Sequence, residues 1–96
     1  MQQERSILHF NIADFAVAVE RVDDSSLADR PVIVAPMRAA RTVVYDMSDE
    51  AYRDGVRKGM ALTRATRLCR GAKVLQPRVE LYRRAMQDFL REVRYY

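Results

Sequence analysis

The sequence predicts an α+β fold: a small mixed sheet packed by short helices, followed by one long C-terminal amphipathic helix. Three observations support this prediction. Short β-branched and apolar runs of strand length recur along the 96 residues. Helix start and stop signals separate those runs. The last apolar pattern has the spacing of a helix that buries one face. A chain of this length forms one domain at most, or a piece of one.

The first part of the chain is predicted to hold a buried strand followed by a helix. The run Ser-Ile-Leu-His-Phe-Asn-Ile gives the strand at residues 6–12. Asp14 is the expected N-cap of a helix over residues 14–21, in which Phe15 and Val19 share a face.

Two neighbouring strands are predicted in the middle of the chain. Pro31 is tolerated at the start of the first, over residues 31–35, and residues 42–45 form the second, antiparallel to the first. Before Pro31 we expect a turn at 23–26 and at most one helical turn, because a residue that precedes proline is biased away from the helical region.

Helix signals dominate the second half. Ser48 is the expected N-cap of a short helix, and Gly55 ends that helix in the left-handed conformation. A strand follows at 73–75, and a long helix covers about 78–94, with an apolar stripe of Val79, Tyr82, Met86, Phe89 and Val93. Between them lies a helix over 61–70 whose inward face is Leu62, Ala65, Leu68 and Cys69. The last helix has no stop signal, which predicts a fragment of a longer protein.

Charge is divided unevenly along the chain. Residues 1–52 carry five arginines against nine acidic residues, a balance of −4, whereas residues 53–96 carry twelve basic residues against four acidic ones, a balance of +8. Fifteen of the seventeen basic residues are arginine, which makes planar two-point contacts with phosphate. The basic half suggests a polyanionic partner, with a solvated surface as the alternative.

Several classes of site are disfavoured by the residues alone. His9 is expected to be packed in its strand, and Cys69 is expected to be structural. The three glycines are isolated, so they do not form a phosphate-binding loop. No apolar run is long enough to span a membrane, no signal peptide is expected, and a single cysteine favours a cytoplasmic location. These features indicate a binding domain or an enzyme fragment without its active site.

Five segments, in order, resemble the opening motifs of Y-family (translesion, ImpB/MucB/SamB-like) DNA polymerases. Residues 7–20 resemble I-x-H-V-D-M-D-A-F-F-A-S-V-E, and residues 27–34 resemble L-x-G-K-P-V-x-V. Residues 55–62 resemble G-V-R-x-G-M-P-L, followed by the A-x-x-L-C of 65–69 and the x-Y-x of 81–83. The resemblance implies a single compact fragment over 1–96, with residues 1–17 and 76–96 palm-like and residues 18–75 fingers-like.

The departures from these motifs fall on the family's functional positions. The two metal-binding carboxylates of the first motif are replaced by Asn11 and Ala13, and the aromatic steric gate is replaced by Ala16. The Y-x-x-R pair that holds the incoming triphosphate is replaced by Asp49 and Tyr52. The resemblance therefore implies that the nucleotide site is lost and that no metal is held.

Three residues remain as candidates near that site. Asp14 lies one residue away from a metal-binding position. Arg38 and Arg41 lie where the family's fingers loop approaches the nascent base pair, so they are the remaining candidates for contact with template or nucleotide.

These features predict a catalytically inactive scaffold or accessory factor in DNA repair and translesion synthesis, like the inactive subunits of bacterial SOS mutagenesis cassettes. Its expected partners are DNA and other replication or repair proteins, with no membrane and no cofactor. One alternative is a divergent active polymerase that uses Mg²⁺ and recruits Asp14. Another is a generic basic nucleic-acid-binding domain that shares only the fold.

Overall fold

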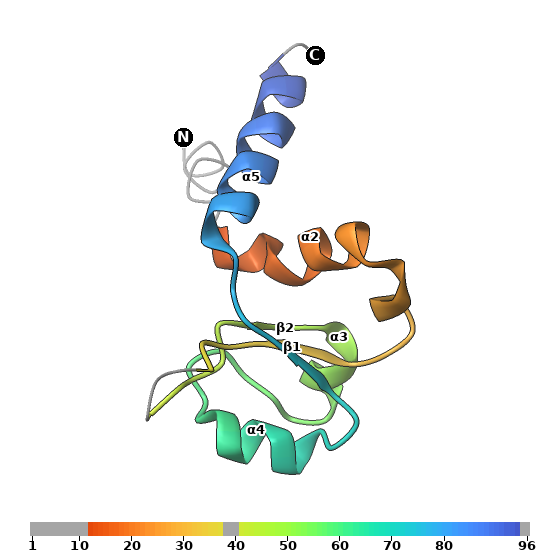
Figure 1. Ribbon diagram of the computed structural model, residues 1–96, viewed down its shortest axis with the longest axis vertical. Helices are drawn as coiled ribbons and strands as arrows, with labels where there is room; N and C mark the ends of the chain where they lie inside the picture. The colour runs from red at the N-terminus through yellow and green to blue at the C-terminus, as the bar shows by residue number, and fades with distance from the viewer. Residues whose placement is uncertain (1–11, 38–40, 95–96) are drawn as a thin grey trace, which may run out of the picture.

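The computed structural model describes residues 12–37 and 41–94 and arranges them in layers (Figure 1). The middle layer is a sheet of three short strands, β1 (Val32–Val34), β2 (Asp46–Met47) and β3 (Lys73–Leu75). Helix α2 (Ala16–Asp23) lies on one face of the sheet, and α3 (Asp49–Arg53) and α4 (Leu62–Leu68) lie toward the other. Two short 3₁₀ helices flank α2, η1 (Ile12–Phe15) and η2 (Ser25–Leu27), and helix α5 (Val79–Arg94) ends the described chain.

The central strand β1 organises the core. It pairs antiparallel with β2, with Ile33 opposite Met47, and parallel with β3, with Ile33 opposite Val74. Side chains alternate between the faces of a strand, so Val32 and Val34 join the cluster under α2, whereas Ile33 joins the cluster over α3 and α4. Both faces of β1 are therefore buried, which explains its uninterrupted apolar sequence.

Helix α3 has the two end signals that the sequence predicts. The Ser48 hydroxyl accepts a hydrogen bond from the Ala51 N–H at 3.3 Å, which caps the first turn. Gly55 follows the helix with a φ of +105°, and its N–H reaches the Tyr52 carbonyl at 3.0 Å. The Val56 N–H donates to the Ala51 carbonyl at 3.1 Å, which completes a Schellman motif.

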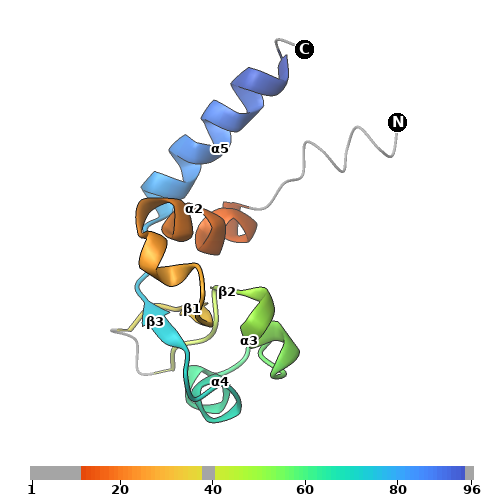
Figure 2. The ribbon, with the colours of Figure 1, turned by 90° about the vertical axis from the view of Figure 1, so that its right-hand side faces the viewer.

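Helix α5 packs against η1 and α2 and extends away from the sheet (Figure 2). Tyr82 is fully buried and joins the cluster of α2 and β1. Farther along, the Phe89 ring meets the edge of the Phe15 ring, with 5.9 Å between centroids, yet Phe89 is 47% exposed. The long helix expected at 78–94 is confirmed, but α2 rather than α5 covers most of that face of the sheet.

Three expectations about the elements were wrong. The helix expected at 14–21 begins as the 3₁₀ helix η1, so Asp14 lies inside a helical turn and caps nothing. The strand expected at 42–45 lies at Asp46–Met47, although the antiparallel pairing itself is confirmed and the Tyr45 N–H donates to the Val34 carbonyl. Leu68 is 42% exposed, because α4 ends there and turns its inward face to Ala65 and Cys69 instead.

Other expectations on single residues fared differently. Cys69 is buried as expected, and burial, with a hydrogen bond to Asp54, raises the pKa of its thiol to about 11. The strand expected at 6–12 and His9 lie outside the described residues, apart from Ile12, which begins η1. None of the described helices is long and apolar enough to cross a membrane.

Candidate functional site

A groove of about 370 Å³ lies where η1 and α2 meet β2 and α3. Its lining contains three acidic and two basic side chains, so the groove carries one net negative charge. The lining residues are Asp14, Val17, Ala18, Arg21, Asp46, Met47, Ser48, Asp49 and Lys58. The groove joins residues far apart in the sequence, because Asp14 precedes α2 whereas Asp46 lies on β2.

Lys58 lies between two carboxylates of the groove. Its ammonium pairs with Asp14 Oδ1 and lies 3.9 Å from Asp46 Oδ1. Asp46 is only 5% exposed, and its Oδ2 accepts a hydrogen bond from the Val17 N–H at 3.0 Å. Burial raises the pKa of Asp46, and the hydrogen bond from Val17 opposes that rise. The side chain of Lys58 thus supplies positive charge within the groove.

Arg21, the second cation of the groove, is also held by the protein. Its Nη2 lies 2.9 Å from Glu50 Oε1, and its Nε donates to the Leu27 carbonyl at 3.0 Å. The hydrogen bond from Arg21 lowers the pKa of Glu50. An anionic ligand that binds either cation of this groove must first displace a carboxylate from that cation.

The replaced family positions are distributed unevenly around the groove. Ala16, at the steric-gate position, is fully buried in the cluster under α2, and Ala13 is also buried. Asp49 lines the groove. Tyr52 is absent from the groove lining, and the Arg57 guanidinium carbon lies 3.6 Å from the centroid of its ring. Asn11 and Arg38 lie outside the described residues.

Sequence reasoning missed the two residues that complete the ion-pair arrangement, Asp46 and Lys58. An acid that directly follows the apolar run Val43-Val44-Tyr45 was one available signal, because a carboxylate at the end of a buried strand needs a partner. The position of Lys58 gave no such signal, since only the tertiary fold brings it to Asp14.

The groove residues do not fit a Mg²⁺ ion, which prefers several anionic oxygens in octahedral geometry. Within the ranges that the structure describes, no three histidine, cysteine or acidic side chains gather to hold a metal. Asp14 and Asp46 both face Lys58, so an added cation would meet like charge.

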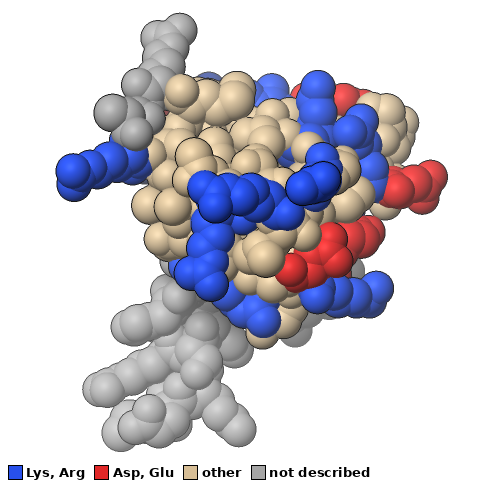
Figure 3. All heavy atoms as spheres, turned by 90° about the horizontal axis from the view of Figure 1, so that it is seen from below, with Lys and Arg blue, Asp and Glu red and all other residues tan. Residues whose placement is uncertain are grey.

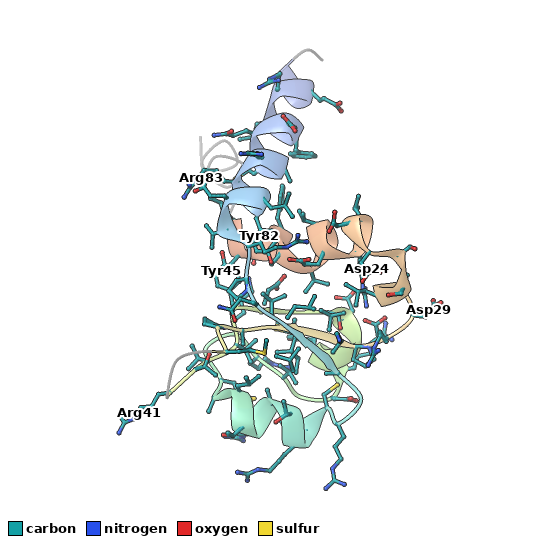
Figure 4. The ribbon with its side chains drawn as sticks, in the orientation of Figure 1. Asp24, Asp29, Arg41, Tyr45, Tyr82 and Arg83 are labelled. Carbon is teal, nitrogen blue, oxygen red and sulfur yellow. The ribbon has the colours of Figure 1, made fainter. Side chains whose placement is uncertain are left out.

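A second, smaller groove of about 300 Å³ lies where Arg41 was expected to act, at the start of α4. Val43 and Ala61 pair across it in an isolated β-bridge, and both are exposed. The remaining lining residues are Arg41, Thr42 and Thr63. Arg41 extends away from the body of the protein, on the side opposite Asp24 and Asp29 (Figure 4). The structure therefore separates Arg41 from the groove that contains Asp49.

A partly buried charged network joins α2 to the start of α5. The Tyr82 hydroxyl donates to Glu20 Oε2 at 2.6 Å, and Arg78 donates from Nε to Oε2 at 3.0 Å and from Nη2 to Oε1 at 2.5 Å. Burial raises the pKa of Glu20, but the hydrogen bonds from Arg78 and Tyr82 outweigh it and lower that pKa overall. Tyr82 also stacks on Tyr45, with 6.3 Å between ring centroids, between the sheet and the helices above it (Figure 4).

Solved structures identify the class of fold. The post-insertion binary complex of Dbh DNA polymerase matches 84% of this chain with a TM-score of 0.78 at 21% identity. The matched region is 24% of the chain of that structure. DinB from Sulfolobus solfataricus matches 71% of this chain and 20% of its own, with a TM-score of 0.67 at 25% identity. The fold is that of the N-terminal region of Y-family DNA polymerases.

Sequence comparison identifies the family. The impB/mucB/samB family matches residues 10–96, and the chain belongs to that family. It is 38% identical over 84 residues to DNA polymerase IV of Pseudomonas entomophila, a match that covers 88% of this chain and 24% of the relative. It is 41% identical over 93 residues to DNA polymerase IV of Stenotrophomonas maltophilia, covering 97% and 26%. The chain thus spans about a quarter of the length of these relatives.

Proposed function

We propose that this chain belongs to a DNA polymerase-like protein that takes part in DNA repair or translesion synthesis without catalysing nucleotide transfer. Its role is that of a scaffold or accessory factor, with DNA and other replication or repair proteins as partners. The observation that carries the proposal is the pairing of Lys58 with Asp14 and Asp46 in a groove of net negative charge.

The electrostatics of that groove oppose binding of a nucleoside triphosphate. A triphosphate carries several negative charges and is held in proteins by cations and by metal ions. Here Asp49 adds negative charge to the lining, and both cations of the lining already have carboxylate partners. Ala13 supplies no ligand atom, and Ala16 is buried, so it has no surface to offer a sugar ring. Binding would require displacement of two ion pairs with no metal to compensate.

Contact with DNA itself does not depend on this groove. Arg41 is exposed beside the smaller groove, whose floor contains the exposed side chains of Val43 and Ala61. Such an arrangement offers a guanidinium to phosphate and apolar surface to a base. We assign one DNA contact of this part of the protein to Arg41 and its surroundings.

Primer extension by the full-length protein tests this proposal. With Mg²⁺, all four deoxynucleoside triphosphates and a primed template, we expect no extension, while DNA polymerase IV of Stenotrophomonas maltophilia serves as the positive control. Template-dependent extension would contradict the proposal.

A second measurement separates the proposal from the active alternative. If extension were observed, the Asp14→Ala variant would decide whether Asp14 had been recruited for catalysis, because only the active alternative predicts loss of turnover in that variant. In the absence of extension, equilibrium titration with a triphosphate and Mg²⁺ should give no saturable binding. Tight binding would contradict the electrostatic argument even for an inactive protein.

A further inference from the structure

The face of the protein formed by α4 and the turn after it carries a cluster of arginines with no acidic partner. Arg64, Arg67 and Arg70 are all exposed, and none has a described carboxylate within 4.0 Å. Figure 3 shows this side of the molecule, with Lys and Arg side chains spread across it and acidic side chains mostly at one side. We name the surface formed by these three arginines the α4 face.

Elsewhere in the described ranges, five cations pair with acidic side chains, whereas others such as Arg53 and Arg84 do not. Lys58, Arg21, Arg78, Arg83 and Arg91 each have a carboxylate within 4.0 Å. The α4 face thus keeps three charges that stabilise no other element of the described structure. Uncompensated like charges repel one another, so their clustering lowers stability slightly unless an anion binds.

We propose that the α4 face binds the phosphate backbone of single-stranded DNA. The inference rests on the proposed function, which makes DNA a partner, and assigns that partner a surface outside both grooves. Guanidinium groups donate two parallel hydrogen bonds to a phosphate and also stack on bases. Three of them at spacings of three residues follow one side of α4 and continue past its last turn.

The shape of the surface favours a single strand over a duplex. Helix α4 has seven residues and is about 10 Å long, which is short for an element that reads a major groove. Leu68, which is 42% exposed, lies among the arginines and offers apolar surface that an unpaired base can contact. In a duplex the base faces are stacked on one another, so they cannot contact the side chain of Leu68.

The α4 face is continuous with the smaller groove. Thr63 lines that groove and is the residue before Arg64, so a strand held near Arg41 can continue onto α4 without leaving the surface. An acidic protein is the competing occupant, but Leu68 is the one exposed large hydrophobic side chain of α4, which offers little apolar surface for a protein interface.

The test uses the full-length protein and a fluorescein-labelled single-stranded oligonucleotide, with binding followed by anisotropy at several salt concentrations. For Arg64→Gln, Arg67→Gln and Arg70→Gln combined, we expect roughly tenfold weaker binding at low salt. The slope of log affinity against log salt should become shallower by about 2, since each phosphate contact on a single strand contributes about 0.7. The corresponding triple lysine variant should retain most of the slope, because it retains the charge.

A matched control removes three arginines from α5: Arg83→Gln, Arg84→Gln and Arg91→Gln combined should leave the slope close to that of the unmodified protein. Equal slopes for the α4 variant and the unmodified protein would overturn the inference and leave an acidic protein as the occupant. An equal loss of affinity for a blunt duplex would overturn the assignment to single strands. Failure of the unmodified protein to bind any DNA would overturn both this inference and the proposed DNA partner. An unchanged thermal midpoint of the α4 variant establishes that folding is not the cause.

Discussion

The charged side chains on the two sides of the sheet differ in whether they have partners within the fold. Above it, charged side chains of α2 and its surroundings pair with partners distant in sequence, which joins η1, α2, β2, α3 and α5. Below it, the arginines of the α4 face have no described carboxylate partner. The paired charges stabilise the fold at the expense of ligand binding, whereas the unpaired charges remain available to an external anion.

This contrast changes the meaning of the basic half of the chain. Part of the excess positive charge after residue 52 is paired with acidic side chains within the fold. Lys58 and Arg78 belong to that half, yet both pair with acids from the first half. Arg64, Arg67 and Arg70 of that half have no described carboxylate partner, and on our proposal they are charges available to DNA.

The largest effect is expected at the Glu20 network of the paired side. Glu20→Ala leaves the buried Tyr82 hydroxyl without its acceptor and leaves Arg78 with Asp23 alone, and should lower the free energy of unfolding by about 3 kcal/mol, since buried hydrogen bonds to a charged group are the strong ones. Denaturant unfolding followed by circular dichroism measures it. Tyr82→Phe removes one hydrogen bond and keeps the ring, so it should cost about 1 kcal/mol. A Glu20→Ala protein as stable as the unmodified one would remove the distinction between the two sides.

The same network gives a pH dependence of known sign. Hydrogen bonds from Arg78 and Tyr82 hold the pKa of Glu20 below its ordinary value of 4.5 in the folded state. Its contribution to stability is therefore present above that value and is lost as the pH falls through the lowered folded-state value. Glu20→Gln should remove the part of the acid sensitivity that Glu20 causes. Unfolding curves measured from about pH 2 to about pH 7, a range that includes the ordinary pKa of a glutamate, test this. An unchanged acid profile in this variant would contradict the assignment.

The next effect is expected at Asp46. Asp46→Ala removes the acceptor of the Val17 N–H in a buried site and should cost about 2 kcal/mol. Asp46→Asn is the matched control, because the amide carbonyl still accepts that hydrogen bond without a buried charge, and it should cost less than half as much. Chemical denaturation of both variants measures the difference. Equal losses would show that the charge of Asp46, and not its hydrogen bond from the Val17 N–H, makes the larger contribution to stability.

A smaller effect is expected at Lys58, whose side chain is one-third exposed. Lys58→Ala should cost about 1 kcal/mol at neutral pH. Burial raises the folded-state pKa of Asp46 above its ordinary value of 3.8, so ionisation of Asp46 opposes folding as the pH rises between the two values. Without Lys58 the folded-state pKa should rise further and that window should widen. Stability measured from acid to neutral pH should therefore fall more in the variant than in the unmodified protein.

The two sides also differ in how far the sequence predicts them. Local signals are sufficient for α3, because Ser48 and Gly55 act within one turn of the helix they bound. The α4 arginines were not predicted as a group, although arginine is rarely buried and their exposure follows from residue type. The paired side cannot be derived in this way, since Glu20 and Tyr82, or Asp14 and Lys58, meet only after distant segments have packed. Asp14 is an example. Its residue type and position favour an N-cap, but η1 places helical turns on both sides of it.

The position of the strand predicted at 42–45 was wrong for a related physical reason. The β-branched residues at 42–45 favour a strand locally, but the hydrogen bonds to β1 run from the Tyr45 N–H to the Ser48 N–H. Asp46, within this stretch, also accepts a hydrogen bond from the Val17 N–H of α2. Val43 instead pairs with Ala61 in an isolated bridge. Tertiary contacts therefore moved the strand by a few residues while the antiparallel arrangement remained.

The smallest effect on stability is expected on the α4 face. Replacing Arg64, Arg67 and Arg70 with glutamine removes no described ion pair, so the free energy of unfolding should stay within about 0.5 kcal/mol of the unmodified protein. Relief of repulsion among the three guanidinium groups acts in the stabilising direction and should be clearest at low salt. Thermal unfolding at low and high salt measures both quantities. A loss above 1 kcal/mol would mean that these arginines stabilise the fold, and the α4 face would then resemble the paired side.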